Sequence, residues 1–379
     1  MMRPMKLAGS QLLFGQGCLE HVKTLNYKRA IVVTGGSSMK KSGMLDRVNS
    51  YLSHAGMALD LIDNVEPDPT FKTIYKGALQ MRGFKPDLIV ALGGGSAMDA
   101  AKAMWIYYEH EDLNALGDIL APKKIPPLRK RAHMLCIPST SGTASEVSRS
   151  IVVTDENTGI KYGIGDMELM PDIAICDPEV TISMPPHISA QTGLDAMTHA
   201  LEALVSNRAN YISDIFAIWA IKDIFNYLPK AYTDGGNIEY REYMLNASLI
   251  AGMAFTNVSL GITHSMAHTM GSYFGLSHGL ADAILLPHVI AFNYKDELAK
   301  NKYDMVAKEL GGGNMADLIA QLNQKVGIPS RLSAVVKDKE TFMKKIDEMA
   351  EMALKDGCTK TNPVIPSLDE FKELFLRSF

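Results

Sequence analysis

Residues 88–105, LIVALGGGSAMDAAKAMW, join an apolar run, three consecutive glycines and a helical pattern. The uninterrupted apolar run is typical of a strand that is buried on both faces of a parallel sheet. The glycines let backbone N–H groups approach a phosphate closely, and the start of the following helix adds unpaired donors and partial positive charge. The same stretch can instead be a plain tight turn, with Ser96 as the helix N-cap and Asp99 as a favourable charge in the first turn.

Four further apolar segments on either side of this unit also resemble strands. They are RAIVVTG (29–35), MALDLIDNV (57–65), HMLCIPST (133–140) and DIAICDP (172–178). Helical patterns such as LDRVNSYLSHAG and TFKTIYKGALQMRG lie between them. Alternation of strands and helices at this spacing predicts a doubly wound parallel sheet.

Strand signals largely end near MPPHISAQTG (184–193). Beyond it, periodic stretches such as residues 212–228 and 315–327 indicate helices. A chain of 379 residues is also long for one core. We therefore expect an α/β dinucleotide-binding domain with a parallel sheet over residues 1–182, followed by an all-α domain over residues 183–379.

A second loop rich in hydroxyl groups follows the segment at 133–140. In CIPSTSGTASEVS (136–148), five short side chains carry hydroxyls: Ser139, Thr140, Ser141, Thr143 and Ser148. Such a row can bind a ribose, a phosphate or a carboxamide, or it can simply cap the turns of an ordinary loop.

Composition argues against several classes of partner. Charged residues make up 21% of the chain and the formal net charge is −4, so no basic field for nucleic acid or for a membrane surface is expected. We find no run of 18 or more apolar residues, and the start MMRPMKLAGSQLLFG lacks the apolar core of a signal peptide. The four cysteines form no CxxC pair, which favours reduced thiols in a cytoplasmic protein.

One aspartate and several histidines form the pattern that points most directly to chemistry. Asp195 and His199 are four residues apart, His264 and His268 repeat that spacing, and His278 follows a glycine-containing break. On helices such pairs project from one face, one turn apart. A lone histidine is usually a core residue, but a carboxylate with several imidazoles is the ligand set of Fe²⁺ or Zn²⁺.

Several motifs in order make the chain resemble the iron-containing, group III alcohol dehydrogenases over almost its whole length. They are GGGSAMDAAK, PSTSGTASEV, DPEVTISMPP, TGLDAMTHALEA and NVSLGITHSMAHTMGSYFGLSHGLADAILLPHV. The resemblance implies an oxidoreductase that transfers hydride between a primary alcohol and its aldehyde, with a divalent metal and a nicotinamide cofactor. It assigns the metal ligands to Asp195, His199, His264 and His278, and places His268 near the nicotinamide and the substrate as the candidate catalytic residue.

The same resemblance implies a set of cofactor contacts. These are Gly94, Gly95, Ser96, Asp99, Ser139, Thr140, Thr143, Ser148, Lys161 and Val180. In NAD-preferring relatives an Asp follows the first strand, where this chain has Gly35. Since a carboxylate there would repel a 2′-phosphate, Gly35 with Ser37 and Ser38 predicts a preference for NADP(H) over NAD(H).

Some properties stay open at this point. Iron is the expected metal, although zinc binds such nitrogen and oxygen sites more tightly. A zinc-dependent glycerol dehydrogenase or a lyase of the dehydroquinate synthase type would use a similar scaffold, and a non-catalytic metal or nucleotide sensor is a third class. Ser150 replaces an Asn of some diol-specific relatives, which weakens a small-diol assignment. The family also suggests a homodimer or higher homo-oligomer, in which the segment MKLAGSQLLFG supplies an edge strand.

Overall fold

The computed structural model describes residues 4–379. The first three residues of the N-terminal stretch, in which no signal peptide was expected, lie outside the described residues. The described chain divides into two compact units. The first ends at Met184 and the second begins at Pro185.

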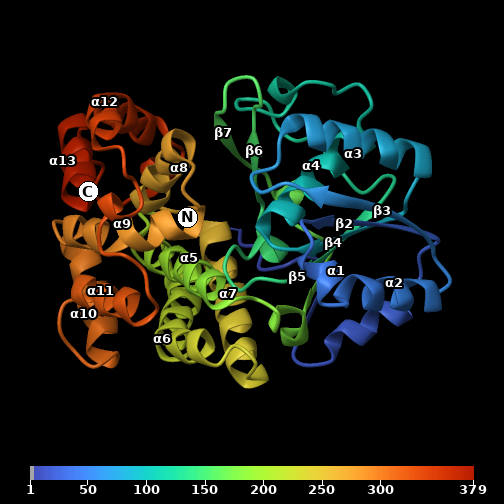
Figure 1. The fold of residues 1–379 in the computed structure, drawn as a ribbon, viewed down its shortest axis with the longest axis horizontal. Coiled ribbons are helices and arrows are strands. Elements are labelled where there is room, and N and C mark those ends of the chain that lie inside the picture. Colours follow the sequence, from blue (N-terminus) through green and yellow to red (C-terminus); the bar gives the residue numbers. More distant parts are fainter. Residues whose placement is uncertain (1–3) are drawn as a thin grey trace. The chain divides into compact units, whose positions relative to one another are not determined.

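The first unit is built on a six-stranded sheet in the order β1-β8-β5-β4-β2-β3 (Figure 1). Every neighbouring pair in it is parallel, as the sequence predicts. The strands are β1 (Gln11–Phe14), β2 (Arg29–Gly35), β3 (Ala58–Val65), β4 (Leu88–Gly93), β5 (His133–Pro138) and β8 (Ile173–Cys176).

Helices cover both faces of this sheet. Figure 1 shows α3 (Phe71–Phe84) and α4 (Gly95–Glu109) on one face and α1 (Ser38–Lys41) and α2 (Met44–His54) on the other. Successive residues of β2 enter different cores, since Ile31 and Val33 pack under α3 and α4 while Ala30 and Val32 pack on the opposite side. Burial on both faces explains why the strands are uninterrupted apolar runs.

The order of the strands reverses beside β2. The chain places β3 on one side of β2 and β4 on the other, so the loops that leave β2 and β4 diverge to opposite faces. In open parallel sheets, ligands bind outside the carboxyl ends of the strands at such a point. Gly35 ends β2 and Gly93 ends β4, which places both glycine turns there.

A two-stranded antiparallel sheet was not predicted. It consists of β6 (Ser150–Thr154) and β7 (Lys161–Gly165). The backbone N–H of Thr154 donates to the carbonyl of Pro69, 2.9 Å away, which ties this hairpin to the loop after β3. Its strands are short and contain Ser, Thr, Lys and Gly, so their pattern resembles that of a loop.

The second unit consists of helices and connecting loops. All of residues 185–379 are described, and none of them is in a strand. The helices are α5 (Pro186–Val205), α6 (Tyr211–Thr233), α7 (Ile238–Val258), α8 (Ile262–Phe274), α9 (His278–Asn293), α10 (Glu297–Glu309), α11 (Met315–Lys325), α12 (Lys339–Lys355) and α13 (Leu368–Ser378). The helices predicted at 212–228 and 315–327 correspond to α6 and α11.

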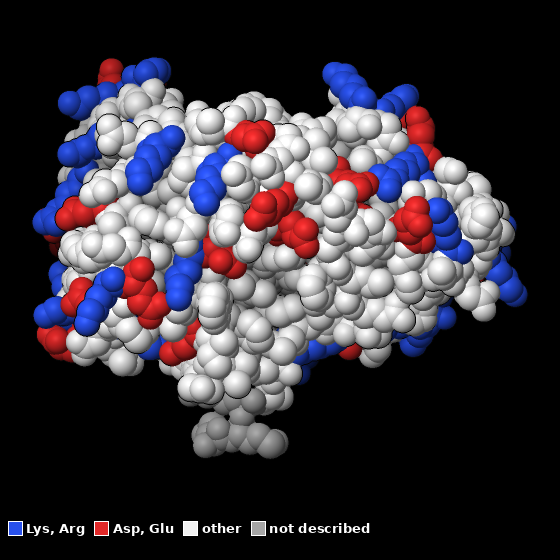
Figure 2. All heavy atoms as spheres, turned by 90° about the horizontal axis from the view of Figure 1, so that it is seen from below, with Lys and Arg blue, Asp and Glu red and all other residues white. Residues whose placement is uncertain are grey.

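On the face drawn in Figure 2, Lys and Arg side chains lie among Asp and Glu side chains. Among the helices of residues 4–379, none is by itself long and apolar enough to cross a bilayer. Helices α7 and α8 meet the length and composition requirement only as a pair, and this pair is bent by 101°.

Two charged side chains are buried below the loop that follows β5. Lys102 is 0% exposed, and its ammonium donates to the carbonyl oxygens of Ser148 and Ser150 at 2.9 and 3.3 Å. Glu146 is 1% exposed, and neither of its carboxylate oxygens has a hydrogen-bond partner. Burial raises the pKa of Glu146 from 4.5 to about 7.

Glu146→Gln should therefore change how stability depends on pH. Between about pH 4.5 and pH 7 the folded chain holds a proton that the unfolded chain has released, so the free energy of unfolding of the wild type falls as pH rises. The variant should lose this decrease, which amounts to at most about 3 kcal/mol. Denaturant unfolding of the first unit across this interval, with exposed Glu156→Gln as control, measures the difference. Parallel pH profiles for the wild type and Glu146→Gln would contradict the account.

Candidate active site

Helix α5 carries three polar side chains on one buried face. Asp195, His199 and Glu202 are 3%, 5% and 3% exposed and are spaced by four and then three residues. This spacing keeps all three on the same side of the helix. Pro186 stands in the first turn, where its missing N–H removes no helical hydrogen bond.

Helices α8 and α9 bring the other histidines to this face. His264 and His268 lie one turn apart on α8, and His278 is the first residue of α9. The residue after it, Gly279, packs against α5 so closely that a Cβ there would be 2.3 Å from the carbonyl oxygen of Gln191. Only glycine permits this approach, which carries His278 to Asp195.

The imidazoles converge on one carboxylate oxygen. The Nε2 atoms of His199, His264 and His278 lie 3.6, 3.9 and 3.7 Å from Oδ1 of Asp195. Oδ1 of Asp195 and Nε2 of His264 are buried without a hydrogen-bond partner. Ligand atoms around one tetrahedral Zn²⁺ or Fe²⁺ lie roughly 3.3–3.6 Å apart. Donor atoms of Asp195, His264 and His278 therefore lie at a spacing that fits a divalent metal, and Nε2 of His199 approaches the same carboxylate oxygen.

Glu202 orients one of these imidazoles and was not predicted. Its carboxylate lies 2.6 Å from Nδ1 of His264 and also accepts from the backbone N–H groups of Gly261 and Thr263 at 2.8 and 2.7 Å. Burial lowers the pKa of His264 well below its usual value, so this ring is neutral and its Nε2 can bind a metal. A carboxylate behind a ligating histidine fixes the ring orientation and raises its basicity.

Two other carboxylates near the histidines were also missed. Asp282 follows His278 by four residues, and its Oδ2 lies 3.1 Å from Nε2 of His278. Asp356 directly follows the last residue of α12, and its Oδ2 lies 2.9 Å from Nδ1 of His268. Burial raises the pKa of Asp356, but its hydrogen bond to His268 and the charge of that ring outweigh burial and lower the pKa overall.

Phe255 packs against the cluster from α7. Its ring stacks on His199 with ring centroids 4.3 Å apart, and it is 6% exposed. In the structure it holds the His199 ring in place.

In the first unit, the glycine turn and the hydroxyl loop pack on each other. A Cβ on Gly94 would lie 3.2 Å from Cγ2 of Thr140, and a Cβ on Gly95 would lie 2.8 Å from Cγ2 of Thr143. Gly94 precedes α4, and no side chain caps the first N–H groups of that helix. These donors stand at the carboxyl edge of the sheet, where a phosphate would be bound.

Unpartnered hydroxyls mark the same edge. Thr140 and Ser141 have buried side-chain oxygens without a hydrogen-bond partner, as does Thr34, next to Gly35. Buried polar groups are nearly always paired, so such a group is a sign of a missing partner. Thr34 was not predicted because it stands within an apolar strand. These hydroxyls and glycines fit a nucleotide cofactor.

The remaining predicted cofactor residues fall into two groups. Gly35, Ser37, Ser38, Ser96 and Ser139 stand at or just beyond the carboxyl ends of β2, β4 and β5. The others already contact the chain itself: Asp99 accepts from Ser145 and Val152, Ser148 accepts from Lys102, Lys161 pairs with Asp68 at 2.7 Å, and Val180 is 1% exposed in a 3-10 helix.

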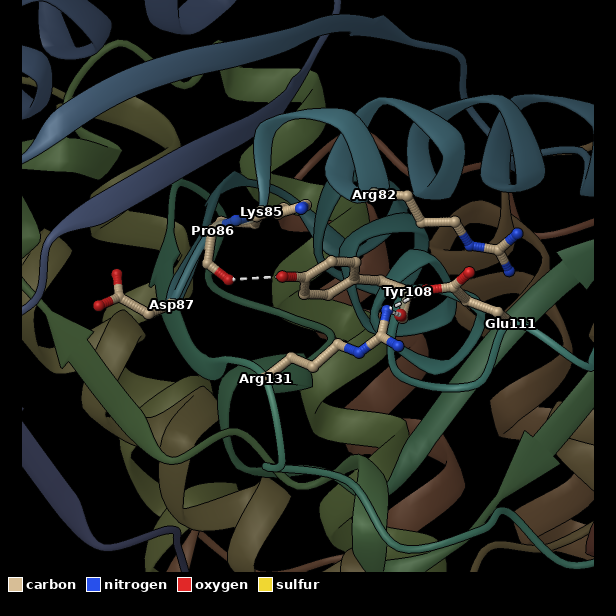
Figure 3. A pocket seen from close by; sticks show the side chains of 7 residues that line it. All are labelled: Arg82, Lys85, Pro86, Asp87, Tyr108, Glu111 and Arg131. Carbon is tan, nitrogen blue, oxygen red and sulfur yellow. Dashed lines mark hydrogen bonds and ion pairs between the residues drawn. The ribbon is translucent and has the colours of Figure 1, made fainter.

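A surface pocket elsewhere in the first unit does not belong to either site (Figure 3). Asp87 and Arg131 come just before β4 and β5, so this pocket lies at the amino ends of the strands, opposite the glycine turns. It is lined by Arg82, Lys85, Pro86, Asp87, Tyr108, Glu111 and Arg131. Arg131 forms an ion pair with Glu111 at 2.6 Å, so one of the cations that line the pocket is already paired within it.

Comparison with known proteins yields matches along both units. Two family models, "Iron-containing alcohol dehydrogenase" and "Fe-containing alcohol dehydrogenase family, C-terminal", match residues 9–178 and 189–379. The NADPH-dependent butanol dehydrogenase of Clostridium saccharobutylicum is 45% identical over 96% of this chain and 95% of its own. The 1-propanol dehydrogenase PduQ of Citrobacter freundii is 36% identical over 96% and 97%. An iron-containing alcohol dehydrogenase structure from Thermococcus thioreducens superposes with a TM-score of 0.92, at 35% identity and 99% coverage of both chains.

Glu202→Gln should weaken metal binding without removing a ligand. The amide retains the size of the carboxylate but loses the charge that supports His264, and loss of such a partner typically costs about 10–100-fold in metal affinity. Competition between the full chain and a metal-sensitive dye measures the dissociation constant for Zn²⁺. Exposed Glu351→Gln on α12 serves as control. Equal affinities for the two variants would contradict the role of Glu202.

Proposed function

The chain belongs to the iron-containing alcohol dehydrogenase family, and we propose that it interconverts a primary alcohol and its aldehyde with NADP(H) in preference to NAD(H). Membership confirms the resemblance drawn from the sequence motifs and makes the chain a metal-dependent, NAD(P)-linked alcohol dehydrogenase. The convergence of three imidazoles on Asp195 is the observation that carries the proposal.

We assign the metal to the second unit and the cofactor to the first. Asp195, His199, His264 and His278 would hold Fe²⁺, and a zinc-loaded form is the alternative when zinc is abundant. A divalent metal in such a site acts as a Lewis acid towards the substrate oxygen. Glu202 keeps His264 oriented, and Phe255 keeps His199 in place. The cofactor phosphates would lie on the N–H groups at the start of α4.

His268 is the proposed proton-transfer residue. Its Nδ1 is bonded to Asp356, which orients the ring, and we assign the exchange of a proton with a reacting hydroxyl to Nε2. The His268 side chain is 18% exposed, whereas that of His264 is 2% exposed. A more accessible imidazole with an oriented ring suits general acid–base work.

The preference for NADP(H) rests on the turn after β2. A side chain at position 35 would clash with the backbone, since a Cβ on Gly35 would lie 2.9 Å from the carbonyl oxygen of Val65. The following Ser37 and Ser38 are exposed, and so are Lys40 and Lys41. Small hydroxyls and cations there suit a 2′-phosphate, and the Clostridium relative is named as an NADPH-dependent enzyme.

Other activities on this scaffold receive less support. The Clostridium and Citrobacter relatives are named butanol and 1-propanol dehydrogenases, which disfavours a glycerol dehydrogenase or a dehydroquinate synthase-like lyase. We also propose a cytoplasmic homodimer or higher homo-oligomer. Strand β1 supports this, because it lies at an edge of the sheet with Phe14 62% exposed.

Substitution of His264 and His268 should separate metal binding from proton transfer. His264→Ala should lose both the metal and the oxidation of NADPH by butanal. His268→Ala should keep the metal but turn over about 10²–10⁴-fold more slowly, as expected for loss of a general acid–base group. Metal content by mass spectrometry and absorbance of the reduced cofactor measure both. Full activity of His264→Ala after chelation would contradict the metal assignment.

Ser37→Asp should reverse the cofactor preference. A carboxylate beside Gly35 would repel the 2′-phosphate of NADPH but accept the ribose hydroxyls of NADH, so kcat/KM should fall at least about tenfold for NADPH and hold or rise for NADH. Ser53→Asp, which adds the same charge at an exposed position late in α2, is the matched control. Comparable kcat/KM values for NADPH and NADH in the wild type would rule out the proposed preference.

A further inference from the structure

We infer that Asp282 is a fifth protein donor to the metal, so that the centre contains two carboxylates and three imidazoles. The inference rests on the proposed function, since it extends the metal site assigned there. Ligand atoms of Asp195, His264, His278 and Asp282 all lie within 4.8 Å of one another. Four donor atoms, which come from α5, α8 and α9, thus surround one small volume.

The environment of Asp282 leaves its carboxylate in need of a cation. The residue is 0% exposed, and neither of its side-chain oxygens accepts a hydrogen bond of good geometry, although Oδ2 lies 3.1 Å from Nε2 of His278. An ionised carboxylate in such a place is costly unless it is paired or coordinates a metal. Within residues 4–379, no Lys or Arg forms an ion pair with Asp282, and the residue that approaches its carboxylate is His278.

The contacted nitrogen shows on which side of the histidines Asp282 lies. Glu202 contacts Nδ1 of His264, the nitrogen that faces away from Asp195, and therefore supports the ring from behind. Asp282 instead contacts Nε2 of His278, the same nitrogen that faces Asp195. Asp282 is thus on the inner side, where a metal ligand belongs, whereas Glu202 is on the outer side.

The distances also fit an additional donor. Oδ2 of Asp282 is 3.1 Å from Nε2 of His278, which matches two adjacent ligands of an ion with bonds of roughly 2.1–2.2 Å. The spacing from His278 to the following aspartate is four residues, so both side chains leave α9 on one face. Helix α9 therefore presents an imidazole and a carboxylate to the same point.

A second carboxylate changes the chemistry of the centre. With Asp195 and Asp282 as ligands, two carboxylate charges would offset those of a divalent cation. Five protein donors that include two hard oxygens suit Fe²⁺ or Mn²⁺ better than Zn²⁺, which prefers four ligands in structural sites. Asp282 would then favour iron over zinc in this chain.

Visible absorption of the Co²⁺-loaded full chain tests the inference. Four-coordinate Co²⁺ absorbs more strongly in its d–d bands than Co²⁺ with five or six donors. Asp282→Asn should therefore intensify these bands relative to the wild type and weaken Co²⁺ binding at least about tenfold. Asp223→Asn, on α6 and half-buried, is the matched control and should resemble the wild type.

His264→Gln distinguishes a failure of the proposed metal site from a failure of the inference on Asp282. If it abolishes Co²⁺ binding while Asp282→Asn shows wild-type bands, the inference on Asp282 is wrong and the metal site stands. If His264→Gln binds Co²⁺ as the wild type does, the proposed metal site itself is wrong. Should Asp282→Asn fail to fold by circular dichroism, X-ray absorption on the wild-type Co²⁺ protein counts the donors directly, and four or fewer would overturn the inference.

Discussion

Buried carboxylates in the second unit are the constraint on which its architecture depends. Asp195, Glu202 and Asp282 are each at most 3% exposed, in a helical core where uncompensated negative charge is costly. Glu202 is bonded to His264 and to two backbone N–H groups, whereas Oδ1 of Asp195 and the oxygens of Asp282 lack hydrogen bonds, so a divalent cation is the natural partner of these two aspartates. The close helix packing serves this requirement, because Gly279 lets α9 approach α5 and Gly261 lets the start of α8 rest on Glu202.

The first unit meets a different requirement, which is to bind an anion mainly through backbone N–H groups and hydroxyls. Uncapped N–H groups at the start of α4 and unpartnered hydroxyls such as Thr140 face the carboxyl edge of the sheet. The buried Lys102 instead anchors the loop that carries Ser148. Backbone donors thus face the ligand, while charged side chains brace the loops from behind, an arrangement that suits a cofactor which must bind and leave.

Features set by local periodicity could be predicted from the sequence. The apolar runs at β2 and β4 show burial on both faces, and the i,i+4 pair Asp195 and His199 shows a polar helical face. The β6–β7 hairpin was not predicted because its strands are short and contain several polar residues. Glu202 and Asp282 had a usable signal, since each lies on the helical face of a predicted ligand. Asp356 had none, because 88 residues separate it from His268.

The central claim is that one metal ion is bound by Asp195, His199, His264 and His278. Anomalous scattering at the iron edge, from crystals of the full chain loaded with Fe²⁺ without oxygen, tests it most directly. The account predicts a single strong peak about 2.0–2.3 Å from a donor atom of each of these four residues. A peak at another place in the chain, or none at all in protein that oxidises NADPH with butanal, would contradict it.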